Sequence, residues 1–348
     1  MRSGLLSLVF LVFTLSVQGR DYYITPNGET VYYHPFPRIF TYRPSPEETS
    51  DYTPFIPHGQ GREGLKEPSG LFIDRTSRLY VSDAGQGEVR VYSIMGRFLF
   101  RIGKGPGTGV PGRPGPLALN PFGDLYIRDR ENGVFHVFDF TGRPLATWEP
   151  RDGEGKRLES PSAFCISPGG DIFVVDGEKS KIHRYSHKRE LLLTFGSFGT
   201  GPGELNHPLA LASGREGEIY VADTRNHRIQ VFRPDGCFLR LFGFPGRRAG
   251  ELFFPHGLAL DGEGRVAVTD LEGRRIQFFT RRGFFLGSLS LSEKEDSSGI
   301  RAGFPVFDAA GSLYIIDGMG REVLKIPPQK IVEHTRSDNK LSGGREGK

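Results

Sequence analysis

The stretch YVADTRNHRIQVF, residues 220–232, gathers side chains that could take part in catalysis or bind a metal. Four of them lie within six positions, namely Asp223, Asn226, His227 and Arg228. A histidine beside a carboxylate can exchange protons near neutral pH, and both groups are metal ligands. The same residue types also hydrogen-bond backbone groups in turns. The segment is therefore either a reaction centre or part of a scaffold.

Similar segments recur along the chain, and each carries an aspartate at the same place. The six aspartates are Asp83, Asp129, Asp176, Asp223, Asp270 and Asp317. Their residue numbers differ successively by 46, 47, 47, 47 and 47, a regular period typical of repeat architectures. One aspartate repeated in every unit does not fit six separate reaction centres. We interpret these carboxylates as structural groups that accept hydrogen bonds from backbone N–H groups in adjoining turns.

Each repeat reads as four short strands joined by tight turns. In the fourth repeat the strands are PLALAS, IYVAD, RIQVF and CFLRLFG, separated by GREGE, TRNH and RPDG. Four antiparallel strands in a repeat of 40–50 residues are typical of a propeller blade. The sequence thus predicts an all-β fold, a six-bladed β-propeller, over residues 51–328. The predicted repeats span 68–103, 116–149, 161–196, 208–243, 255–289 and 305–328.

The sixth repeat lacks a clear fourth strand, which would leave the ring open at one seam. Proteins generally avoid such an unpaired strand edge. Residues 51–57 precede the first repeat and could supply the missing strand. We expect the segment near Tyr52 to Ile56 to pair with the strand Val323 to Ile326.

Both flanks of the propeller differ from it in composition. Residues 1–19 contain the apolar run LLSLVFLVFTLSV, which is too short for a helix that crosses a bilayer and is typical of a secretory signal peptide. The sequence therefore predicts a secreted or extracellular protein without a membrane span after cleavage; an uncleaved anchor is the alternative. Residues 20–50 are rich in tyrosine and proline, which indicates an extended segment, either a flexible leader or a peptide that binds a partner. The polar residues 329–348 are expected to be disordered.

Cysteine usage and charge narrow the function classes. Cys165 and Cys237 could form a disulfide in an oxidising compartment, but they occupy non-equivalent repeat positions, which favours two unpaired thiols. The formal net charge is only +4, whereas a protein that binds nucleic acid usually has a dominant basic field. We therefore expect no nucleic-acid partner.

The pattern GxGPGELxxPxxLAL…GxIYVADxxNxRIQVFxxDGxFLxxFG resembles the NHL repeat. The fourth repeat matches it nearly throughout, at GTGPGELNHPLALASGREGEIYVADTRNHRIQVFRPDGCFLRLFG, residues 199–243, and the fifth is close. The resemblance implies a six-bladed propeller. It does not imply one function, because NHL propellers occur in ubiquitin ligases, RNA binders, enzymes and extracellular interaction modules.

An enzymatic function is the alternative. The peptidyl-hydroxyglycine amidating lyase is a related secreted propeller, and the resemblance implies zinc held by histidines at the PH entrances of several blades. Here PHGLAL retains one such histidine, His256, while the other entrances read PSGLFI, PLALNP, PSAFCI, PLALAS and PVFDAA. Catalytic zinc takes about three protein ligands, so we expect neither metal nor cofactor. A ubiquitin-ligase role lacks its RING finger, because two cysteines cannot build one.

Function in a propeller is expected where the repeats differ, on the loops of one face. The turns between second and third strands emerge on the same face as the crossings between blades. On this face, blades four and five contribute most of the basic groups. The expected partner-binding residues are Arg225, Asn226, His227, Arg247, Arg248, His256 and Arg274. We expect a non-enzymatic scaffold for a protein or glycan partner; an ordinary solvated surface is the alternative.

Overall fold

The computed structural model describes residues 15–17, 20–24, 30–32, 53–54, 64–103, 112–159, 161–270, 274–290, 304–317, 322–328 and 331. The chain divides into two compact units, Met1–Ile39 and Phe40–Lys348. In the first unit, β1 (Leu15–Val17), β2 (Arg20–Ile24) and β3 (Thr30–Tyr32) form an antiparallel sheet in that order. The rest of the predicted leader lies outside the described residues, so its cleavage stays a prediction.

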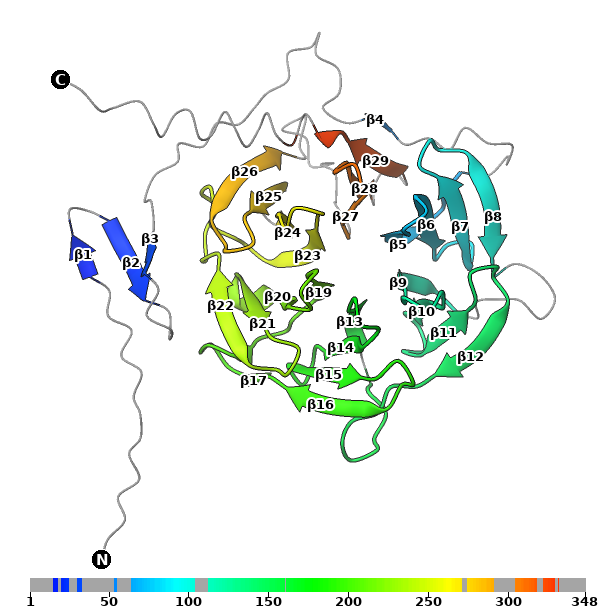
Figure 1. Cartoon of the computed structure of the whole chain (residues 1–348), viewed down its shortest axis with the longest axis horizontal. Helices are drawn as coiled ribbons and strands as arrows, with labels where there is room; N and C mark the ends of the chain where they lie inside the picture. The colour runs from blue at the N-terminus through cyan, green and yellow to red at the C-terminus, as the bar shows by residue number, and fades with distance from the viewer. Residues whose placement is uncertain are drawn as a thin grey trace, which may run out of the picture. The chain divides into compact units, whose positions relative to one another are not determined.

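The second unit contains six four-stranded antiparallel sheets, the blades of a propeller (Figure 1). Blade 1 consists of β5 (Pro68–Ile73), β6 (Arg78–Asp83), β7 (Glu88–Ser93) and β8 (Phe98–Ile102). Blade 2 consists of β9 (Pro114–Leu119), β10 (Leu125–Asp129), β11 (Phe135–Phe138) and β12 (Pro144–Trp148). Blade 3 consists of β13 (Pro161–Ile166), β14 (Ile172–Asp176), β15 (Lys181–Tyr185) and β16 (Leu191–Phe195). Blade 4 consists of β19 (Ala210–Ser213), β20 (Ile219–Asp223), β21 (Arg228–Phe232) and β22 (Phe238–Phe242). Blade 5 consists of β23 (Pro255–Leu260), β24 (Val266–Asp270), β25 (Arg275–Phe279) and β26 (Phe285–Ser290). The predicted all-β propeller with four antiparallel strands per blade is confirmed.

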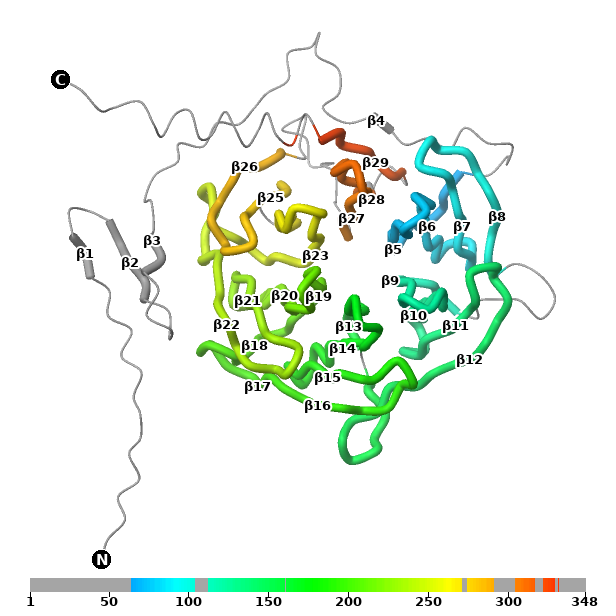
Figure 2. The backbone as a smooth tube through the Cα atoms, in the orientation of Figure 1, coloured from blue at the N-terminus to red at the C-terminus, as the bar shows by residue number. Residues whose placement is uncertain are grey.

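In blades 1 to 5 the first strand lies nearest the centre of the ring and the fourth lies at its rim (Figure 2). The crossing from blade 3 to blade 4 contains a short parallel pair, β17 (Ser197–Phe198) and β18 (Glu204–Leu205). The turn between β20 and β21 is the 3-10 helix η1 (Thr224–Asn226). Among the described residues, no helix has the length and apolar character needed to cross a membrane.

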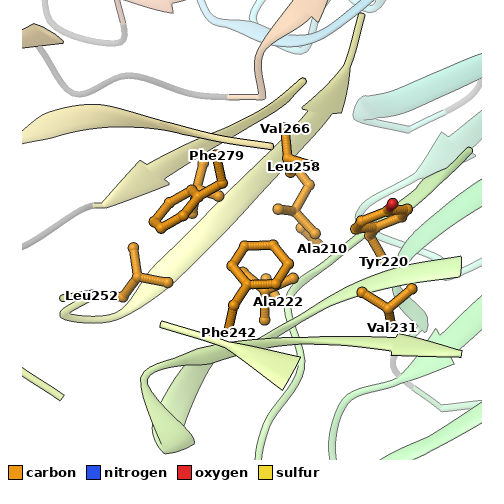
Figure 3. Close-up of a cluster of buried hydrophobic side chains, with 11 residues drawn as sticks. Ala210, Tyr220, Ala222, Val231, Phe242, Leu252, Leu258, Val266 and Phe279 are labelled. Atoms are coloured by element: carbon orange, nitrogen blue, oxygen red, sulfur yellow. The ribbon is translucent and has the colours of Figure 1, made fainter. Parts of the chain in front are cut away.

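Each hydrophobic core lies between two neighbouring blades. Between blades 4 and 5, Ala222 and Val231 share a cluster with Leu252, Leu258 and Val266 (Figure 3). These side chains are almost completely buried, and full burial of a valine or leucine contributes about 1.5–3 kcal/mol. A blade therefore depends on its neighbours, and the positions of its loops depend on the ring.

Blade 6 joins segments from both ends of the second unit. Its strands are β27 (Val306–Phe307), β28 (Leu313–Asp317), β29 (Glu322–Ile326) and β4 (Thr53–Pro54). Opposite β4, Leu324 faces Pro54 and Lys325 faces Thr53. This ladder of two residue pairs has the location expected for the closing strand; its role in ring closure stays a prediction. Ile331, in the tail expected to be disordered, is buried in the core between blades 5 and 6.

The strand register corrects two details of the repeat boundaries. The inner strand β9 begins at Pro114, two residues before the predicted start of the second repeat at 116. Leu119 pairs with Leu125, and the equivalent pair in blade 6 is Phe307 with Leu313. The segment PVFDAA is therefore shifted along its blade relative to PHGLAL, so the two segments are not equivalent by register. Pairing with the second strand sets the register, and a proline followed by apolar residues does not reveal it.

Candidate functional site

The Asp223 carboxylate lies at the end of β20 and is fully buried. It accepts hydrogen bonds from the backbone N–H of Asn206 at 2.6 Å, Asn226 Nδ2 at 2.9 Å, Arg228 Nε at 2.8 Å and Gln230 Nε2 at 2.9 Å. These donors come from the β20–β21 turn, from β21 and from the crossing that enters blade 4. The carboxylate therefore joins the turn to the crossing, and its oxygens are occupied by protein donors.

The same bond between aspartate and crossing recurs in other blades. Asp83 accepts from the N–H of Glu67, Asp129 from that of Arg113 and Asp270 from that of Phe253, at 2.9, 3.1 and 3.0 Å. In blade 3 the bond that Asp176 accepts comes from Lys179 in its own turn. The side chain of Asp317 lies outside the described residues. This recurrence supports the interpretation of the aspartates as structural groups.

Arginines at the start of the third strand fix the crossings in blades 4 and 5. Arg228 donates to the carbonyls of Thr200, Gly201 and Glu204 at 2.7–3.0 Å. Arg275, its counterpart by register, donates to the carbonyls of Arg247, Arg248 and Glu251 at 2.7–3.0 Å. Both also pair with the aspartate of their own blade. The crossing that carries Arg247 and Arg248 is thus held by hydrogen bonds from the Arg275 side chain.

In five blades, the last residue of the turn between the second and third strands adopts a left-handed backbone conformation. Glycine occupies this position in two of them, but His227 and Arg274 have φ values of 56° and 47°. The His227 ring stacks on Phe253, with centroids 5.0 Å apart and planes 8° apart. Its Nδ1 accepts a hydrogen bond from the Phe254 N–H at 3.2 Å. Burial lowers the pKa of His227, which favours the neutral ring that this bond requires.

Arg225, Arg247, Arg248 and Arg274 are exposed, and we call these four arginines the blade 4–5 patch. The Arg247 guanidinium lies 5.1 Å from the centre of the Phe253 ring, on which His227 also stacks. The Arg275 side chain donates hydrogen bonds to the backbone carbonyls of Arg247 and Arg248, and Arg275 follows Arg274 in the sequence. Contacts therefore connect the two turns and the crossing that carry the patch.

His256 occupies a different position. It lies on the innermost strand β23, where its Nδ1 is 3.2 Å from Thr269 Oγ1 and burial lowers its pKa. The positions equivalent by register hold Ser69, Gly115, Ser162 and Leu209 in blades 1 to 4. Among the described residues, no group of three or more His, Cys, Asp or Glu side chains is placed to hold a metal. His256 therefore belongs to no such group in the described part of the chain.

The family comparison falls on the segment that contains the Asp223 network. The family model for the NHL repeat matches residues 205–232, which run from the crossing through β21. The chain is an NHL-repeat β-propeller. No curated protein sequence matches it.

Solved structures similar to this NHL propeller include enzymes. A streptogramin B lyase is 12% identical over 79% of this chain and 96% of its own, with a TM-score of 0.56. A gluconolactonase from Xanthomonas campestris is 17% identical over 79% and 88%, with a TM-score of 0.58. Virginiamycin B lyase from Staphylococcus aureus is 12% identical over 75% and 84%, with a TM-score of 0.54. At such identities these likenesses show the fold alone.

Sequence reasoning missed the aromatic residues that organise the patch. Phe253 and Phe254 lie in the crossing FFPH, and their rings contact each other and His227. The only signal was a pair of aromatic residues before a proline, where most other blades have polar residues. The two cysteines are free thiols, as expected, with Cys165 buried and Cys237 exposed.

Proposed function

We propose that this NHL propeller is a secreted, non-enzymatic interaction scaffold whose blade 4–5 patch binds an acidic protein partner. Four exposed arginines on loops with fixed backbones carry the proposal. Arginine binds carboxylates through a planar fork of N–H groups, which suits an acidic surface.

The rigidity of the loops supports binding. Arg275 holds the carbonyls of Arg247 and Arg248, and the stack of His227 on Phe253 holds the neighbouring turn. A loop already fixed in the free protein loses less conformational entropy when it binds. The patch is therefore suited to a partner whose acidic groups have a matching fixed spacing.

A metal-dependent lyase or hydrolase is the second candidate, since similar solved structures include a lyase and a gluconolactonase. Their identity to this chain is too low to transfer an activity. His256 also lacks a second histidine at the equivalent positions of blades 1 to 4. Stoichiometric zinc or calcium in the purified protein would favour the enzyme over the scaffold.

The experiment compares partner capture by the full chain and by a variant with four charge reversals, R225E, R247E, R248E and R274E. Both are immobilised and exposed to the same conditioned medium at physiological ionic strength. The proposal expects at least one protein that the parent retains and the variant loses. Digestion of glycans before capture distinguishes a glycan ligand from a protein ligand.

A matched control reverses four exposed arginines in turns of the opposite face, R75E, R97E, R215E and R282E. The control has the same net charge as the patch variant, so it removes the general effect of charge. Partner retention by the control, with loss by the patch variant, supports the proposal. Equal retention by both variants contradicts it.

A further inference from the structure

Arg128 occupies a position that is buried and uncharged in blades 1, 3, 4 and 5. It lies on β10 opposite Phe135, and by register its counterparts are Val175 in blade 3 and Ala222 in blade 4. Both counterparts are buried in cores between their blade and the next. Arg128 therefore introduces a guanidinium at the boundary of blades 2 and 3, one residue before the loop face.

This guanidinium has no acceptor among the described residues. Its Nε is buried without a hydrogen-bond partner, and the carboxylate of the adjacent Asp129 accepts from Arg113, Glu131 and Asn132 instead. Burial lowers the pKa of Arg128 to about 10, so the group is still cationic at neutral pH. The side chain as a whole is half-buried, and a cation that is partly removed from water without an anionic partner is costly, which points to a missing anion.

A second cation and a small residue lie beside it. The charge of Arg130 also lowers the pKa of Arg128, so the two guanidinium groups repel each other. Arg130 is only loosely paired, with Nη1 4.0 Å from Glu67 Oε1. Its Cγ would lie 2.5 Å from a Cβ added at Gly115. The equivalent residues in blades 1 and 3 are Ser69 and Ser162, so blade 2 leaves this space to arginine.

We propose that Arg128 and Arg130 bind a small oxyanion, a carboxylate or phosphate group, at the loop-face end of β9 between blades 2 and 3. Such a group would accept hydrogen bonds from both guanidinium groups and neutralise their repulsion. The site lies on other blades than the blade 4–5 patch and does not depend on the proposed function. It would give the propeller a small-molecule ligand in addition to a protein partner.

The test measures the unfolding temperature and binding enthalpy of the full chain in sodium phosphate and in sodium acetate, each against sodium chloride at equal ionic strength. We expect either oxyanion to raise the unfolding temperature above that in chloride. Arg128→Met should abolish this rise and weaken binding by about tenfold or more. In chloride alone, Arg128→Met should not lower the unfolding temperature, because it removes a half-buried unpaired charge.

Two further variants keep the test decisive. Gly115→Ser introduces the residue found at this position in blades 1 and 3 and displaces Arg130, so it should weaken oxyanion binding even if Arg128→Met fails to fold. Arg97→Met, an exposed arginine of the opposite face, should leave binding unchanged. The proposal is overturned if neither oxyanion stabilises the parent beyond chloride. It is equally overturned if Gly115→Ser binds phosphate and acetate as tightly as the parent and the Arg97→Met control do.

Discussion

Asp223 and Asn206 are 17 residues apart in the chain, yet the Asp223 carboxylate accepts the Asn206 N–H at 2.6 Å. This bond joins the end of a second strand to the crossing that enters its blade. Because three side-chain donors also point at the same carboxylate, the Asp–Asn–His–Arg cluster acts as a scaffold. Its histidine is engaged with the next crossing and not with the aspartate.

We predict that Asp223→Ala lowers the free energy of unfolding by several kcal/mol. The substitution removes the acceptor for four donors, and each donor left buried without a partner costs about 1–3 kcal/mol. Chemical denaturation followed by tryptophan fluorescence measures the change. Asp235→Ala, at an exposed turn aspartate, is the matched control and should change stability little. Equal stability of the two variants would contradict the structural role of Asp223.

Ring closure through β4 predicts that deletion of residues 51–60 markedly lowers the unfolding temperature. The deletion removes the backbone that pairs with Leu324 and Lys325 and leaves the edge of β29 open. Differential scanning calorimetry measures the effect. Deletion of residues 20–29, in the other compact unit, is the control. An unchanged melt after deletion of 51–60 would reject closure by this segment.

We predict that His183 in blade 3 makes the stability of the folded protein sensitive to acid. Its Nε2 and Asp176 Oδ2 are both buried without hydrogen-bond partners, whereas Gln230, the counterpart in blade 4, donates to Asp223 at 2.9 Å. His183→Gln should restore this bond in blade 3 and stabilise the protein by about 1 kcal/mol at pH 7.

The pH dependence follows from burial, which lowers the pKa of His183 below its ordinary value of 6.5. On acidification through pH 6.5, the unfolded chain binds a proton at this site before the folded protein does, so stability falls. His183→Gln lacks this proton uptake, and its advantage over the parent should grow between pH 7 and pH 5. Urea titrations at several pH values measure it. A constant difference would contradict the account.

The two thiols should differ in reactivity. Burial raises the pKa of Cys165 to about 12, and the thiolate is the reactive form, while Cys237 is exposed. An aromatic disulfide reagent should therefore titrate one thiol in the folded protein and two in denaturant. Cys237→Ser should abolish the fast reaction. Two fast thiols in the native protein would contradict the burial of Cys165.

The fold could be predicted from the sequence because a local feature, the aspartate that ends the second strand, recurs at a regular period. This period did not place the start of β9, since three prolines lie in PGRPGP and only pairing with β10 selects Pro114. Nor did it reveal the stack of His227 on Phe253, which joins a turn to a crossing 26 residues later. Arg128 was missed because LYIRD does not show whether the arginine has a partner.

Whether the blade 4–5 patch binds a partner is best decided by the affinity of the captured protein. Surface plasmon resonance should compare the parent with R247E/R274E, whose side chains lie on the two segments held by Arg275. We predict at least about tenfold weaker binding for this variant, since two charged contacts are lost, at an unchanged unfolding temperature. Equal dissociation constants for the two proteins would show that the blade 4–5 patch is an ordinary solvated surface.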